Sequence, residues 1–94
     1  MLTITDSAEL VLRKIPEQYA DPRTAGLRIA LAAECGDRLQ VRAVPSPEPD
    51  DQVVEFDGAR IFLGPVAARR LSGKQLDADL DARGRIQFRT RRGG

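Results

Sequence analysis

The sequence has no histidine, one cysteine (Cys35) and no apolar run long enough to cross a membrane. Because histidine is the commonest general base, its absence argues against most acid–base catalysis, and no enzymatic activity is expected. One thiol cannot close a disulfide within the chain, so folding does not depend on oxidation, which suits the reducing cytoplasm. The longest apolar stretch, residues 27–33, is interrupted by Arg28 and is far shorter than the roughly 20 residues of a spanning helix.

A surplus of charge is also lacking. Fifteen basic residues stand against fourteen acidic residues, which leaves a net charge of +1. This balance provides no global attraction to nucleic acid or to an anionic membrane. The first nine residues have neither a basic start nor an apolar signal segment, so export is not expected. With 94 residues, 41% hydrophobic and 31% charged, the sequence predicts one compact cytoplasmic domain.

The N-terminal part of the chain predicts a short strand and a helix. Apolar residues alternate with threonine over residues 2–5, as they do in a strand. Asp6 and Glu9 have the spacing of a capping box, in which Asp6 accepts from the Glu9 amide and Glu9 reaches back to the cap. Apolar residues at helical spacing follow. The helix is expected to end before Pro16, because proline disfavours helical geometry in the preceding residue.

The remainder of the chain predicts mostly strands. Two alternating stretches, residues 27–31 and 39–43, place Cys35 at or beside a hairpin turn. Asp57-Gly58 is a strong turn signal between two further strands, and Pro65 suits the first position of a short helix. The sequence therefore predicts an α+β fold that is mostly β, with two short helices. The last two strands are expected over residues 76–80 and 85–89.

Several segments occur together in a recognisable order: LTITDSAE, GLRIAL, DDQVVEFDGARIFL with the proline-started helix behind it, LSGKQLDADL and GRIQF. They cover most of residues 2–88, and this collinear set resembles the A-type iron–sulfur carriers, also called HesB/IscA-like proteins. The resemblance implies a compact, β-rich HesB/IscA-like domain over residues 1–89. The residues after it, 90–94, predict a short basic flexible tail. It also implies a protein, often dimeric or tetrameric, that binds iron or an iron–sulfur cluster and passes it to apo-proteins.

The sequence departs from this family in the residues that would hold the metal. The family has one cysteine after a glycine pair at the end of the GLRI strand and two more in a C-terminal Cys-Gly-Cys. Here Ala33-Glu34 replaces the glycine pair, Cys35 lies near the first ligand position, and RTRRGG follows Phe88. Clusters are normally held by four ligands, mostly thiolates, and carboxylates hold them poorly. Cys35 is thus the only candidate ligand for a metal or cofactor, and the usual cluster ligation is not expected.

Three functions remain open after these observations. The first is a divergent, non-enzymatic iron–sulfur cluster assembly protein without a resident cofactor, which acts as an accessory or interaction protein on assembly components or clients. The second is a labile iron or iron–sulfur carrier that uses Cys35 from two chains of a homodimer. The third is a protein-interaction module unrelated to iron. Each is expected to bind protein partners rather than nucleic acid or membrane, as a monomer or a homodimer.

Two other groups of residues suggest binding less strongly. Asp77, Asp79 and Asp81 are spaced like the start of an EF-hand loop, but Ala82 and Phe88 stand where that loop needs glycine and glutamate. The three aspartates are therefore expected on the solvent face of a strand. Five arginines and no acidic residue occur after Ala82. They are interpreted as charge balance for the aspartates rather than as an RNA contact, because stacking aromatic residues are missing nearby.

Overall fold

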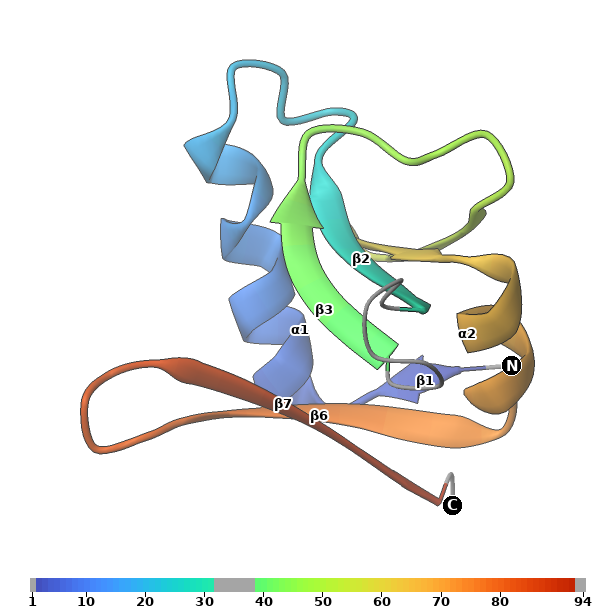
Figure 1. The fold of residues 1–94 in the computed structure, drawn as a ribbon. Helices are drawn as coiled ribbons and strands as arrows, with labels where there is room; N and C mark the ends of the chain where they lie inside the picture. Colours follow the sequence, from blue (N-terminus) through green and yellow to red (C-terminus); the bar gives the residue numbers. More distant parts are fainter. Residues whose placement is uncertain (1, 32–38, 93–94) are drawn as a thin grey trace.

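The computed structural model describes residues 2–31 and 39–92. Within these ranges it confirms the predicted class, an α+β fold that is mostly β with two short helices (Figure 1). The helical elements are α1 (Asp6–Lys14), the 3₁₀ helix η1 (Pro16–Gln18) and α2 (Pro65–Arg70). The strands are β1 (Thr3–Ile4), β2 (Gly26–Leu31), β3 (Leu39–Val44), β4 (Gln52–Phe56), β5 (Ala59–Leu63), β6 (Lys74–Leu80) and β7 (Ile86–Arg92).

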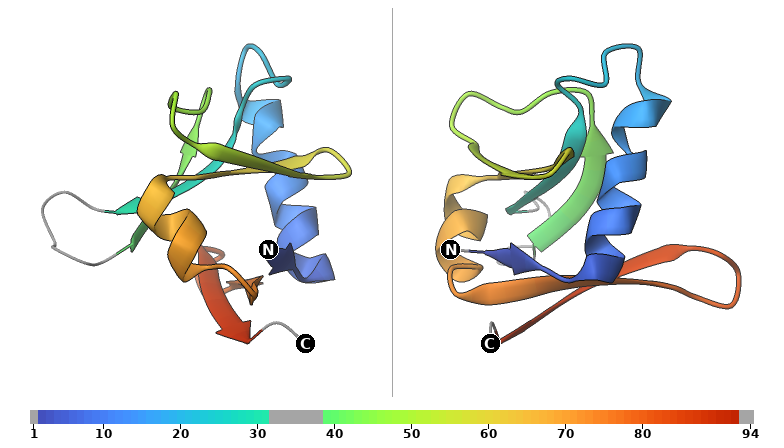
Figure 2. Two further views of the ribbon diagram at one scale, coloured as in Figure 1. Left: turned by 90° about the vertical axis from the view of Figure 1, so that its right-hand side faces the viewer. Right: turned by 180° about the vertical axis from the view of Figure 1, so that it is seen from behind.

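The strands form two sheets that enclose a common core. One sheet has the order β3-β2-β5-β4, in which β2 and β5 are parallel; the other has the order β1-β6-β7, in which β1 and β6 are parallel. Helix α1 contacts β5 in the first sheet and β6 in the second. Figure 2 shows α1 and α2 on opposite sides of the β2–β3 pair. The core between these elements includes Leu12, Leu27, Ile29, Val54, Ile61, Leu63, Leu71 and Leu76.

The start of α1 differs in detail from the prediction. The sequence predicts Asp6 as the cap, but Asp6 is already helical and the cap is Thr5, whose hydroxyl accepts a hydrogen bond from the Ala8 amide at 3.2 Å. Glu9 does not fold back to the cap; its carboxylate lies 3.3 Å from Arg13, one turn further along. The same Thr5 hydroxyl donates to Asp77 in β6 at 2.7 Å. A partner from a distant strand therefore favours Thr5 over Asp6 as the cap.

The turn between β4 and β5 confirms the prediction from Asp57-Gly58. Both residues have positive φ, 46° for Asp57 and 92° for Gly58, which is the backbone that a two-residue hairpin turn requires. Phe56 and Ala59 are the directly paired residues on either side of the turn.

The C-terminal strand is longer than the sequence predicts. The sequence predicts a flexible tail from residue 90 onward, but Thr90, Arg91 and Arg92 pair with residues of β6 in an antiparallel ladder. The reason is that β6 begins at Lys74, early enough to supply a partner for each residue of β7. Across the described ranges, no helix combines the length and the apolar character needed to cross a bilayer.

Candidate functional site

Cys35, the ligand that the sequence predicts, lies outside the described residues. The strands on either side of it are described. Leu31 at the end of β2 and Leu39 at the start of β3 are directly paired in the antiparallel ladder, so their Cα atoms are about 4.5–5.5 Å apart. The two residues that flank positions 32–38 are therefore neighbours, and the Leu31 side chain is exposed. This end of the β2–β3 ladder is the reference point for the site.

One face of β2 carries a cavity of about 190 Å³ near this point, lined by Arg28, Ala30, Leu31, Gly64, Pro65 and Val66. The charged member of the lining is Arg28. Its guanidinium donates twice to Asp51, from Nε to Oδ2 at 2.8 Å and from Nη2 to Oδ1 at 3.0 Å. The cavity is therefore bordered by a cation that is already neutralised.

The Arg28–Asp51 pair is the best-shielded ion pair in the described part of the chain. The Asp51 side chain is fully covered and that of Arg28 is 20% exposed. Asp51 Oδ2 also accepts from the Glu48 amide at 2.9 Å. The hydrogen bond from Arg28 holds the pKa of Asp51 below its usual value, while the same bond raises the pKa of Arg28. The pair fixes the proline-rich connection before β4 onto β2.

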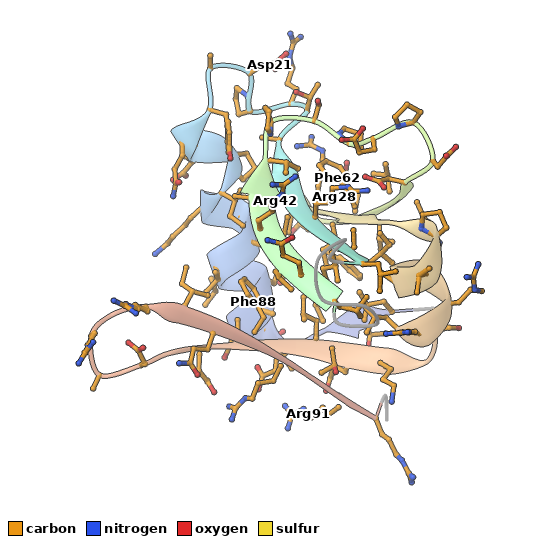
Figure 3. The ribbon with its side chains drawn as sticks, in the orientation of Figure 1. Asp21, Arg28, Arg42, Phe62, Phe88 and Arg91 are labelled. Carbon is orange, nitrogen blue, oxygen red and sulfur yellow. The ribbon has the colours of Figure 1, made fainter. Side chains whose placement is uncertain are left out.

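The opposite face of β2 carries a second cavity, which lies between β3 and β7 and has a volume of about 160 Å³. We call it the edge groove. Its lining is mainly apolar, with Phe88 from β7 pointing into it in Figure 3. The lining residues are Ile29, Leu39, Val41, Leu71, Leu76, Phe88, Arg89 and Thr90.

The three aspartates of β6 and the turn after it do not converge on one point. Asp77 is mostly covered and binds the Thr5 hydroxyl, a contact that is the main reason for its lowered pKa. Asp79 pairs with Arg89 on β7. Asp81 lies in the turn, where its carboxylate accepts from the amides of Arg83 and Arg85, both at 2.9 Å. The predicted strand face is right for Asp77 and Asp79, which alternate with the buried Leu76 and Ala78. It is wrong for Asp81, which lies in the turn, and the predicted charge balance with arginine is present.

These residues do not fit a metal or an iron–sulfur cluster. Among residues 2–31 and 39–92, no three histidine, cysteine, aspartate or glutamate side chains gather closely enough to hold a metal ion. Over the whole sequence there is one thiol and no imidazole, whereas a cluster normally requires four ligands, mostly thiolates. No chemical step through a cluster is therefore assigned to the described residues.

Sequence reasoning missed both the Arg28–Asp51 pair and the edge groove. The sequence does contain a signal for the pair, because Arg28 interrupts an apolar strand. A charged side chain that is buried in such a strand needs a partner of opposite charge. Nothing in the spacing identified that partner, which lies 23 residues away. The groove left no local signal, because it forms between strands that are distant in the sequence.

Comparison with known protein sequences identifies a relative but no family. No protein-family model matches the chain. The uncharacterized protein blr1755 of Bradyrhizobium diazoefficiens is 29% identical over 79 residues, which cover 82% of this chain and 74% of that protein. Because that protein is itself uncharacterized, the likeness in sequence supplies no function.

Solved structures show the fold. The structure of IscA with the 2Fe–2S cluster matches with a TM-score of 0.69 and 29% identity, over 98% of this chain and 85% of that one. Escherichia coli SufA, involved in the biosynthesis of iron–sulfur clusters, matches with a TM-score of 0.74 and 24% identity, over 97% and 79%. A protein from Aquifex aeolicus matches with a TM-score of 0.66 and 24% identity, over 94% and 89%. The chain has the HesB/IscA-like fold that its sequence resemblance predicts.

Proposed function

We propose that this protein is a divergent, non-enzymatic iron–sulfur cluster assembly protein of the A-type carrier kind, which acts in the cytoplasm as an accessory or interaction protein. Its protein partners would be assembly components or the clients that receive clusters. The proposal is supported by the combination of a carrier's fold and too few ligands for a cluster. The match to IscA covers 98% of the chain, yet the 94 residues include one cysteine and no histidine.

Copurification tests this proposal directly. The tagged protein, isolated without oxygen from cells that express it at natural levels, is expected to enrich an iron–sulfur assembly component or an iron–sulfur client at least several-fold over a tag-only control. Mass spectrometry would identify the enriched proteins. Reproducible enrichment of proteins with no connection to iron or sulfur would contradict the proposal and favour an interaction module unrelated to iron.

A labile carrier is the second candidate, because one structural neighbour, IscA, was crystallised with a 2Fe–2S cluster. Two Cys35 thiolates in a homodimer would provide half of the usual four ligands, and the remaining positions would be filled by carboxylates or an outside thiol. Such a site would lose its cargo readily, since oxygen donors hold clusters poorly.

Reconstitution with iron and sulfide separates the two candidates. After anaerobic loading and desalting, we expect wild-type protein to retain no more iron than Cys35→Ala and to show no sulfide-to-iron absorption bands. The variant is the matched control, because it removes the one thiol. Stable bands in the wild type that are lost in Cys35→Ala, together with a dimer in sedimentation that forms with iron, would establish the carrier instead.

A further inference from the structure

The edge groove lies between two strands that each have one unpaired edge. In the described part of the chain, β3 ends one sheet and β7 ends the other. Figure 1 shows both strands on the same side of the molecule, in front of β2 and β6. Strand edges with unpaired backbone groups are natural templates for an added strand. Val41 of β3 is 37% exposed beside this opening.

The hairpin turn determines which β7 amides face outward. Asp81 closes the turn, because its carbonyl accepts from Gly84 at 3.0 Å and its amide donates to the Arg85 carbonyl at 2.9 Å. This is a three-residue loop with Gly84 in the left-handed region, at φ 78°. Pairs in an antiparallel ladder alternate between bonded and non-bonded. Ile86, Phe88 and Thr90 therefore belong to non-bonded pairs, and their amides point to the free edge.

The two faces of β7 differ in chemistry. Phe88 points toward the groove, while Arg91 points to the opposite side (Figure 3). Residues 82–92 carry five arginines and no acidic residue. Arg89 and Arg91 lie against Asp79 and Asp77. The side chains of the other three make no hydrogen bond or ion pair with a described residue; they are Arg83, Arg85 and Arg92.

We infer that the edge groove is a docking site for an extended acidic segment of a partner protein. The segment adds a strand to the free edge of β7, so that the outward amides of Ile86, Phe88 and Thr90 are paired. Because side chains alternate along a strand, one set of its side chains is apolar and enters the groove. The volume of about 160 Å³ suits one benzene-sized group. The other set is acidic and meets the arginines on the opposite face and at the turn, above all Arg83 and Arg85, whose side chains have no described partner.

Charge decides between this occupant and two others. A second copy of the chain would bring two arginine-rich β7 strands together, and like charges in paired strands are destabilising. Single-stranded nucleic acid needs exposed aromatic rings on which its bases stack. The one aromatic side chain of β7, Phe88, is half-buried and lines the groove. An acidic polypeptide complements both the arginines and the free edge. The inference rests on the proposed function in taking the partner to be a protein.

A titration followed by NMR tests the site. The probe is an eight-residue peptide of alternating glutamate and leucine, added to ¹⁵N-labelled protein. We expect saturable shifts that are largest at the amides of Ile86, Phe88 and Thr90. Thr90→Pro removes one outward amide and leaves the ladder to β6 intact, so it is expected to weaken binding at least tenfold. Thr90→Val keeps the amide and is the matched control, expected within twofold of wild type.

A second variant tests the contribution of charge. Arg83→Gln combined with Arg85→Gln removes two charges without breaking a described side-chain contact, and is expected to weaken binding three- to tenfold. A peptide of alternating lysine and leucine is expected to cause no saturable shifts at β7. Urea denaturation establishes that each variant is folded.

Several results would overturn the site. Equal binding of the glutamate peptide by wild type and Thr90→Pro would show that the strand edge is not used. Equal binding of the lysine peptide and the glutamate peptide would show that charge does not select the partner. Stronger competition for β7 by a single-stranded oligonucleotide would make it a nucleic-acid surface, and a peptide-independent dimer broken by Thr90→Pro would make it a self-interface.

Undiminished copurification of assembly components with Thr90→Pro would overturn this site and leave the proposed function standing. The function would fail instead if no such component copurified while the peptide still bound.

Discussion

Replacing Phe62 with alanine is expected to lower the free energy of unfolding by about 3–5 kcal/mol, the range for truncating a fully buried aromatic side chain. Phe62 is 1% exposed. Its neighbours in β5, Ile61 and Leu63, belong to the main core, so Phe62 lies on the other face of the sheet. Its paired residues are Arg28 in β2 and Val53 in β4, and Figure 3 shows the ring near Arg28. The ring is thus the apolar centre of that face.

The surroundings of Phe62 allow little collapse after truncation. Gly26 in β2 leaves room for the ring, since a Cβ atom there would lie 3.0 Å from Phe62 Cε2 and 2.7 Å from the Arg60 carbonyl oxygen. Backbone atoms therefore form part of the wall and cannot move in to fill the space. A cavity that stays open adds to the loss of transfer free energy, which places the expected effect within the upper part of the range for core substitutions.

Urea denaturation followed by circular dichroism would measure this change. Phe62→Leu keeps most of the volume and is expected to cost less than about 1.5 kcal/mol, so it remains measurable if the alanine variant does not fold. Val53→Ala is the control, because Val53 is paired with Phe62 but is 51% exposed, and its expected cost is below about 1 kcal/mol. A loss under 1 kcal/mol for Phe62→Ala would show that the ring is not enclosed.

Local pattern was sufficient to predict most elements of this fold. Alternation located β2 and β3, Asp57-Gly58 located the hairpin between β4 and β5, and Pro65 located the start of α2. Each of these signals depends on residues that are close in the sequence. The sequence predicts the cap one residue too late, at Asp6, because the observed cap, Thr5, also bonds to Asp77, which is 72 residues away.

The candidate site was much less predictable for the same reason. The sequence placed Cys35 between two strands but could not say which side chains lie near the ends of those strands. The groove between β3 and β7 exists because two separate sheets bring their edges to one side of the molecule. The outward direction of the Thr90 amide follows from the register of the β6–β7 ladder. Neither property has a signal within one segment.

Replacing Asp51 with asparagine is expected to lower the free energy of unfolding by about 2–4 kcal/mol at pH 7. Asparagine keeps the shape of the side chain but leaves the Arg28 guanidinium without its counter-charge in a covered position. Removing one partner of a buried pair costs more than the pair contributes, because the remaining charge stays desolvated. Breaking a fully buried pair costs about 3–5 kcal/mol. The loss expected here is somewhat smaller, because the Arg28 side chain is 20% exposed.

The same substitution makes a prediction about pH. The pKa of Asp51 is lower in the folded protein than its ordinary value of 3.8, mainly because of the hydrogen bond from Arg28. A lowered pKa means that the folded state favours the carboxylate, so this stabilisation is complete above the unfolded pKa and is lost as the pH falls through the folded pKa. The difference between wild type and Asp51→Asn is therefore constant near neutrality and shrinks below about pH 4. Asp77 also has a lowered pKa, but it is present in both proteins and cancels.

Unfolding curves at several pH values, with Asp79→Asn as the control, would test both statements. The Asp79–Arg89 pair has about half or more of each side chain exposed, so its loss is expected to cost less than about 1 kcal/mol. A double-mutant cycle sharpens the result. Arg28→Met alone leaves a covered carboxylate, whereas Arg28→Met with Asp51→Asn leaves no charge at all. The combined loss is expected to be at least about 1 kcal/mol smaller than the sum of the single losses, and strict additivity would show that the two groups do not act as a pair.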